Sequence, residues 1–165
     1  MKSHSNYIYE KASELAKIGT IRDIVDYLDL RVEYVNFKKQ KGVYVILEDF
    51  KFIFINNNLD DPLKKIVLLH EIAHDQLHSD FASYFVDANI FSTDTWEYEA
   101  NLFASHIILP DEKILPLIYE GYSEESIAGM FQTDINLVSI KVFDLTRRGH
   151  NLDCLSYDSN FLRTN

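Results

Sequence analysis

The N-terminal part of the chain carries apolar residues at helical spacing. Between residues 7 and 30 they recur every three or four positions, and Gly19 and Thr20 interrupt the pattern. Apolar residues at this spacing form one face of an amphipathic helix, and a glycine commonly ends one. We therefore predict helical structure over 7–30 with a break near residue 19.

Three short stretches that follow have the pattern of strands. Residues 32–37 alternate, whereas 43–47 and 52–55 are rich in β-branched and aromatic residues, and the Glu-Asp-Phe-Lys sequence between the last two predicts a hairpin. The expected fold class is α+β, with a small three-stranded antiparallel sheet packed on helices. The strand 52–55 is either an ordinary strand or an edge strand that binds an extended peptide.

Two longer amphipathic helices are predicted next. Asp60 or Asp61 can cap the first, and Pro62 lies in its opening turn, where a missing N–H does no harm. Its apolar stripe contains Leu63, Ile66, Val67, His70, Ala73, His74 and Leu77. The second helix covers about 95–108, and the mixed sequence 79–95 predicts a loop with a short helical turn.

The apolar spacing in the C-terminal third of the chain predicts three shorter helices, over 111–119, 123–131 and 135–148. From these patterns we expect three parts: a core of residues 1–110, a helical, helix-turn-helix-like subdomain of 111–148 packed on the core, and a tail of 149–165.

Charge and composition narrow the possible functions. The chain has 16 Lys and Arg against 26 Asp and Glu, a net charge of −10, which repels nucleic-acid phosphates. The segment 123–143 has the core spacing of a helix-turn-helix, but its second helix offers only Lys141 as a cation for DNA. We therefore expect a structural helix pair and no direct nucleic-acid partner.

The single cysteine, Cys154, excludes a disulfide within the chain and a cysteine-based metal site. The first residues lack the apolar core of a secretory signal, and no apolar run approaches the length of a membrane span. We expect a cytoplasmic protein that does not insert into a membrane.

The first long helix carries the sequence His-Glu-Ile-Ala-His at His70, Glu71 and His74. Residues four apart lie one turn apart on the same face, so both imidazoles can bind one metal ion. Glu71 is not a ligand but can reach a water molecule on that ion. Zinc lowers the pKa of such a water from near 16 to about 7, so Glu71 is the predicted catalytic base. Unliganded histidines on a buried stripe would be costly, which disfavours a chance match.

A catalytic zinc ion needs a third protein ligand. Glu97 shares a helix face with apolar residues of 95–108, whereas Glu99 is rotated away from them. We therefore predict Glu97 as the ligand and Glu99 as a surface charge. Asn101 lies one turn after Glu97 and is either an acceptor that orients His70 or an ordinary surface residue. His78 is either an oxyanion donor or, as we favour, a cation at the helix end.

These residues together resemble the ImmA/IrrE family of metallopeptidases. In that family a strand ends in Asn, one helix carries His-Glu-x-x-His, and a second carries Glu-x-x-Ala-Asn-x-Phe-Ala before an apolar pair and a proline. The matching residues are Asn56, His70 to His74, Glu97, Ala100, Asn101, Phe103, Ala104 and Pro110. The resemblance covers roughly residues 40–145, and His106 is a departure from an acidic residue that is usual there.

The resemblance implies a compact gluzincin-like core with Glu97 as the third zinc ligand. It also implies a zinc endopeptidase that cuts an Xre-like helix-turn-helix repressor of a phage or mobile element. Two rivals are a non-catalytic antirepressor that acts by protein binding and a DNA-binding regulator that uses 123–143. Zinc is the expected cofactor, although two histidines and a carboxylate also accept manganese or cobalt.

Overall fold

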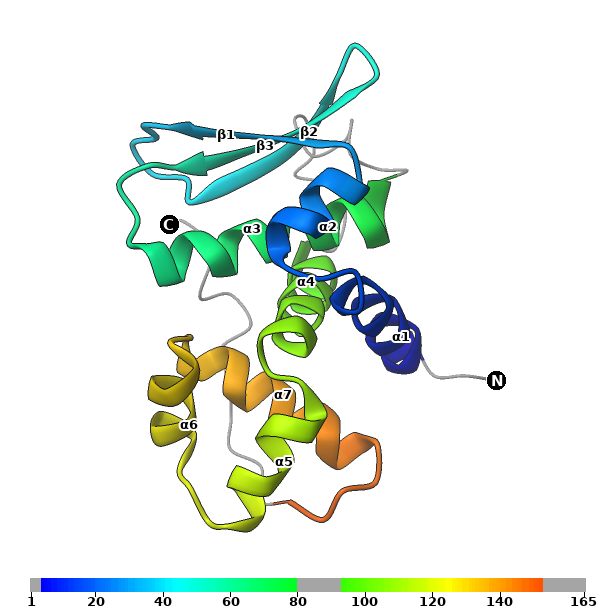
Figure 1. Cartoon of the computed structure of the whole chain (residues 1–165), viewed down its shortest axis with the longest axis vertical. Helices are drawn as coiled ribbons and strands as arrows, with labels where there is room; N and C mark the ends of the chain where they lie inside the picture. Colours follow the sequence, from blue (N-terminus) through cyan, green and yellow to red (C-terminus); the bar gives the residue numbers. More distant parts are fainter. Residues whose placement is uncertain (1–3, 80–92, 153–165) are drawn as a thin grey trace.

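The computed structural model describes residues 4–79 and 93–152. Its helices are α1 (His4–Ala16), α2 (Ile21–Tyr27), α3 (Asp61–His78), α4 (Thr93–Ile108), α5 (Asp111–Tyr119), α6 (Glu124–Phe131) and α7 (Ile135–Arg147), and its strands are β1 (Leu30–Val35), β2 (Gly42–Leu47) and β3 (Phe50–Asn56). The sheet lies at one end of the molecule with α3 beneath it, and α5, α6 and α7 lie at the other end (Figure 1). The α+β class is confirmed, and the sequence 80–92, where we predict a loop, lies outside the described residues.

The predicted break near residue 19 is confirmed, because α1 and α2 are separate helices. Thr20 caps α2: its side chain accepts from the backbone N–H of Asp23, and the Asp23 carboxylate accepts from the backbone N–H of Thr20. This reciprocal pair satisfies two N–H groups that a helix start leaves open. The helical segment ends earlier than predicted, since Asp29 adopts a left-handed φ of 52° and Leu30 begins β1.

The sheet is mixed, so the prediction of an antiparallel sheet is wrong. Its strand order is β1-β3-β2, with β1 parallel and β2 antiparallel to β3. The predicted hairpin joins β2 and β3 through Glu48 and Asp49, which have φ values of 48° and 68°. Two successive positive φ values are those of a tight turn whose twist matches the strands. Residue alternation predicts strands but not their order, and here β1 pairs with the far side of β3.

The same topology decides between the two interpretations of 52–55: β3 is the central strand, so it is an ordinary strand of the sheet and not an edge strand. The edges of the sheet in the described residues are therefore β1 and β2. Any peptide that joined the sheet would have to pair with one of these two strands.

Helix α3 forms as the sequence predicts and is anchored to the sheet. The Asp60 side chain accepts from the backbone N–H of Leu63, and a proline follows in the first turn. Near the other end, the buried Asp75 carboxylate accepts from the Tyr44 hydroxyl of β2 at 2.7 Å and pairs with Lys51 of β3 at 2.9 Å. These contacts fix the helix that carries the His-Glu-x-x-His sequence against two strands.

Helix α4 lies at the centre of the molecule and packs against α1, α3 and α7 (Figure 1). Its apolar residues join the main core, which includes Ala100, Leu102, Phe103 and Ala104. Helix α7 is also largely buried, and its Lys141 side chain is fully shielded from solvent. The cation that a DNA-binding interpretation of 123–143 requires therefore cannot reach a phosphate.

A cluster of charges holds α7 to the start of α5. Lys141 Nζ lies 2.5 Å from Asp111 Oδ1, and the Arg148 guanidinium contacts both oxygens of Asp111 at 2.6 and 3.1 Å. Arg148 Nε also donates to Asp144 at 2.8 Å. These cations outweigh the effect of burial and lower the pKa of Asp111 to about 2.

We predict that Asp111→Asn destabilises the protein, because Lys141 would remain buried without its carboxylate. The expected loss is about 3 kcal/mol, the lower end of the roughly 3–5 kcal/mol for a broken buried ion pair, since Asp111 is partly exposed. Urea unfolding followed by circular dichroism measures it. Glu112→Gln, at the exposed neighbouring position, is the control, and equal stability of the two variants would refute the prediction.

No helix in the described ranges combines the length and the apolar character needed to cross a lipid bilayer.

Candidate metal centre

Three metal-binding side chains converge where α3 packs against α4. His70 and His74 lie one turn apart on α3, and Glu97 approaches them from α4. The Nε2 atoms of the two histidines are 3.1 Å apart. One Glu97 oxygen lies 3.3 Å from Nε2 of His70, and the other lies 3.6 Å from Nε2 of His74. Both histidines are buried.

These separations are close to those between the ligand atoms of a tetrahedral ion. With zinc–ligand bonds of about 2.0–2.2 Å, two ligand atoms of a tetrahedral site lie roughly 3.3–3.6 Å apart. The observed distances of 3.1, 3.3 and 3.6 Å are close to these values, and the last two run to different oxygens of Glu97. A catalytic zinc site keeps a fourth position for water or substrate beside its three protein ligands. The chemistry of the donor set does not by itself select zinc over other divalent transition metals.

The surroundings act differently on the two histidines. Burial is the largest influence on both and lowers the pKa, but at His70 the hydrogen bond and charge of Glu97 outweigh it, and the pKa is raised. At His74 the neighbouring His70 reinforces burial, and the pKa falls to about 3. His74 is therefore neutral near pH 7, which is the form of imidazole that binds a metal.

Asn101 contacts the ring of His70 from α4. Its Oδ1 lies 2.9 Å from Nδ1 of His70, and the side chain is fully buried. An amide oxygen only accepts, so Nδ1 of His70 carries a hydrogen, and in the neutral, metal-binding form of the ring the lone pair is on Nε2. Of the two sequence interpretations, the exposed surface residue is excluded by this burial.

Glu71 lies next to the cluster and is buried against β2. The backbone N–H of Tyr44 donates to its carboxylate. Gly42 of the same strand leaves the space that Glu71 fills, because a Cβ there would lie 2.9 Å from Oε1 of Glu71 and 2.4 Å from Val67. Burial, the largest influence, raises the pKa of Glu71 to about 7. A general base is most effective when its pKa is near the working pH.

Known proteins resemble this chain in sequence. Residues 25–142 match the IrrE N-terminal-like domain, which is a peptidase family. The chain belongs to the ImmA/IrrE family. Metallopeptidase ImmA of Bacillus subtilis (strain 168) is 34% identical over 162 residues, which are 90% of this chain and 94% of that protein. An uncharacterized immunity region protein 2 of Bacillus phage phi105 is 30% identical over 121 residues, 72% of this chain and 77% of that protein.

Within this ImmA/IrrE chain, Glu99 is not the surface charge that the helix pattern predicts. It is 8% exposed, its Oε2 lies 2.9 Å from Nε2 of His78, and its Oε1 lies 2.8 Å from Nε2 of His4. Hydrogen bonds and charges of the two histidines outweigh burial and lower the pKa of Glu99. The prediction is wrong because α1 covers this side of α4, and the sequence of α4 carries no sign of a neighbour 95 residues away.

His78 is the last residue of α3, which is the helix end where the sequence places it. It is buried, and its Nδ1 lies 3.1 Å from Nδ1 of His74. Its ring also stacks on Trp96, with ring centroids 5.3 Å apart. The sequence spacing could have indicated this contact, because His78 follows His74 by four residues and residues four apart are neighbours on one helix face.

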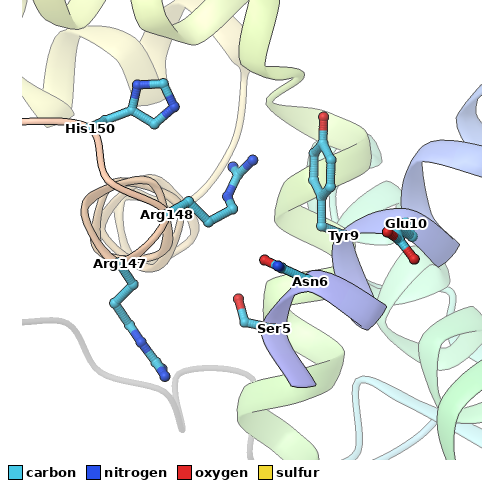
Figure 2. Close-up of a pocket in the computed structure, with 7 residues that line it drawn as sticks. All are labelled: Ser5, Asn6, Tyr9, Glu10, Arg147, Arg148 and His150. Atoms are coloured by element: carbon cyan, nitrogen blue, oxygen red, sulfur yellow. The ribbon is translucent and has the colours of Figure 1, made fainter. Parts of the chain in front are cut away.

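A polar pocket lies apart from the metal cluster, between α1 and the end of α7. Figure 2 shows its lining residues, which are Ser5, Asn6, Tyr9, Glu10, Arg147, Arg148 and His150. It shares no lining residue with the metal cluster. Arg148 already pairs with Asp111 and Asp144 and lies over the ring of Tyr9, so its charge is balanced within the fold.

Proposed function

We propose that this chain is a zinc-dependent endopeptidase that makes a specific cut in a helix-turn-helix repressor of a phage or mobile element. The observation that carries the proposal is the convergence of His70, His74 and Glu97, whose ligand atoms lie within 4.8 Å of one another, with Glu71 beside them. The relatives support it, because one is named as a metallopeptidase and another comes from a phage immunity region.

In this proposal His70, His74 and Glu97 hold the ion, and Asn101 keeps the ring of His70 in place. A zinc ion supplies a Lewis acid for the scissile carbonyl and makes water acidic enough to lose a proton near pH 7. Glu71 takes the proton from the attacking water at its carboxylate. It then gives that proton to the nitrogen of the leaving amine, so it serves as base and then as acid.

The substrate peptide would lie along β2 rather than along the central strand β3. Strand β2 is an edge of the described sheet, and the Tyr44 N–H that donates to Glu71 belongs to it. An extended peptide paired with this edge would run past Glu71 and the metal ligands. Backbone pairing of this kind requires an unfolded or exposed segment of the repressor.

The DNA-binding alternative is disfavoured by the burial of Lys141 and by the net charge of −10. The antirepressor alternative differs from the proposal in its product, since a binding protein leaves the repressor intact.

We expect cleavage when the chain is produced together with a helix-turn-helix repressor encoded beside its gene. Intact-mass spectrometry should show two fragments whose masses sum to the repressor plus one water, because hydrolysis adds one water per cut. A repressor that co-purifies uncut would favour the antirepressor, and a repressor that is neither cut nor bound would refute this substrate.

A further inference from the structure

Two residues outside the predicted site form a chain of hydrogen bonds that ends at a metal ligand. Glu99 contacts Nε2 of His78 at 2.9 Å, and Nδ1 of His78 contacts Nδ1 of His74 at 3.1 Å. Nε2 of His74 then lies at the metal cluster. Glu99, His78 and His74 are buried, so water does not compete for these contacts.

The direction of each hydrogen bond follows from the groups involved. A carboxylate only accepts, so Nε2 of His78 carries a hydrogen and donates to Glu99. A neutral His78 then has its lone pair on Nδ1, where it accepts from Nδ1–H of His74. This leaves the lone pair of His74 on Nε2, the atom that faces Glu97 and His70. The opposite order would place a hydrogen on Nε2 of His74 and prevent metal binding.

We propose that His78 and Glu99 are positioning residues that fix the metal-binding tautomer and the ring orientation of His74. This inference rests on the metal centre of the proposed function. Asn101 orients the ring of His70 through one hydrogen bond. His78 and Glu99 orient the ring of His74 through two hydrogen bonds in succession. His4 completes the arrangement, since its contact with the second oxygen of Glu99 leaves the first oxygen for His78.

Two substitutions of His78 separate this role from packing. His78→Phe keeps a ring that can stack on Trp96 but has no acceptor for His74. His78→Asn loses the ring, but its Oδ1 stands in for Nδ1 as an acceptor. If His78 only filled space, Phe would be the milder change; if it positions His74, Asn is the milder change.

The test is the zinc dissociation constant of the purified full chain, measured by competition with a chromophoric chelator at fixed pH. We expect His78→Phe to weaken zinc binding by about 10–100-fold, the usual effect of losing a partner of a metal-bound histidine, and His78→Asn to restore most of the loss. The absorption bands of the cobalt-loaded protein should change in the Phe variant and stay close to wild type in the Asn variant. Circular dichroism of the metal-free variants verifies that each is folded.

Zinc binding by His78→Phe that equals wild type, or an equal loss in both variants, would overturn the proposal. If either variant does not fold, Glu99 decides the question. Glu99→Gln keeps an acceptor for Nε2–H of His78 and should bind zinc more tightly than Glu99→Leu, whereas equal affinities would overturn the proposal. A wild-type chain that binds no zinc would instead contradict the metal centre itself.

Discussion

Replacing Glu71 by Gln should abolish most repressor cleavage while zinc remains bound. The amide cannot take a proton from water, and loss of a general base costs about 10²–10⁴-fold in rate. The amide oxygen can still accept from the Tyr44 N–H, so the local fold should survive. The rate is measured from the appearance of fragments by intact mass, and the zinc content by elemental analysis of the same sample.

Glu33→Gln is the matched control, because it makes the same chemical change on an exposed position of β1. It should cleave and bind zinc like wild type. A Glu71→Gln variant that keeps more than a tenth of the rate would mean that another group serves as the base. Loss of zinc from that variant would mean that Glu71 helps to hold the ion.

The second large effect is expected at the third ligand. Glu97→Gln should weaken zinc binding far beyond the roughly 10–100-fold that loss of a supporting hydrogen bond costs, because a neutral amide replaces a charged ligand. Cleavage should fall with it at zinc concentrations that saturate wild type. The measurement is the same chelator competition used for the histidine variants.

Glu99→Gln, two residues along the same helix, provides the comparison. It removes the same charge but keeps an acceptor for His78, so its loss of affinity should be much smaller. The reverse ranking of the two variants would mean that Glu99, and not Glu97, is the ligand.

The helices that carry the site could be predicted because their signals are local. An aspartate cap, a proline in the first turn and a stripe that includes His70 and His74 define α3, and they depend only on neighbouring residues. The choice of Glu97 over Glu99 likewise follows from rotation about one helix axis. The structure places Glu97, and not Glu99, within reach of both Nε2 atoms.

What could not be predicted depends on contacts between distant segments. The order of the strands depends on the position of β3 between β1 and β2. The alternation of residues along each strand is the same for parallel and antiparallel pairing, so it does not predict this order. The burial of Glu99 depends on α1, whose His4 precedes Glu99 by 95 residues in the sequence. The contacts of Asp75 with Tyr44 of β2 and Lys51 of β3 also join segments that are distant in the sequence. Local patterns contain none of this information.

The most direct test of the metal centre is a crystal structure of the zinc-loaded protein with anomalous diffraction recorded at the zinc absorption edge. One peak is expected in each chain, about 2.0–2.2 Å from Nε2 of His70, Nε2 of His74 and a carboxylate oxygen of Glu97. A zinc peak bound by other residues, or no peak between α3 and α4, would contradict the account.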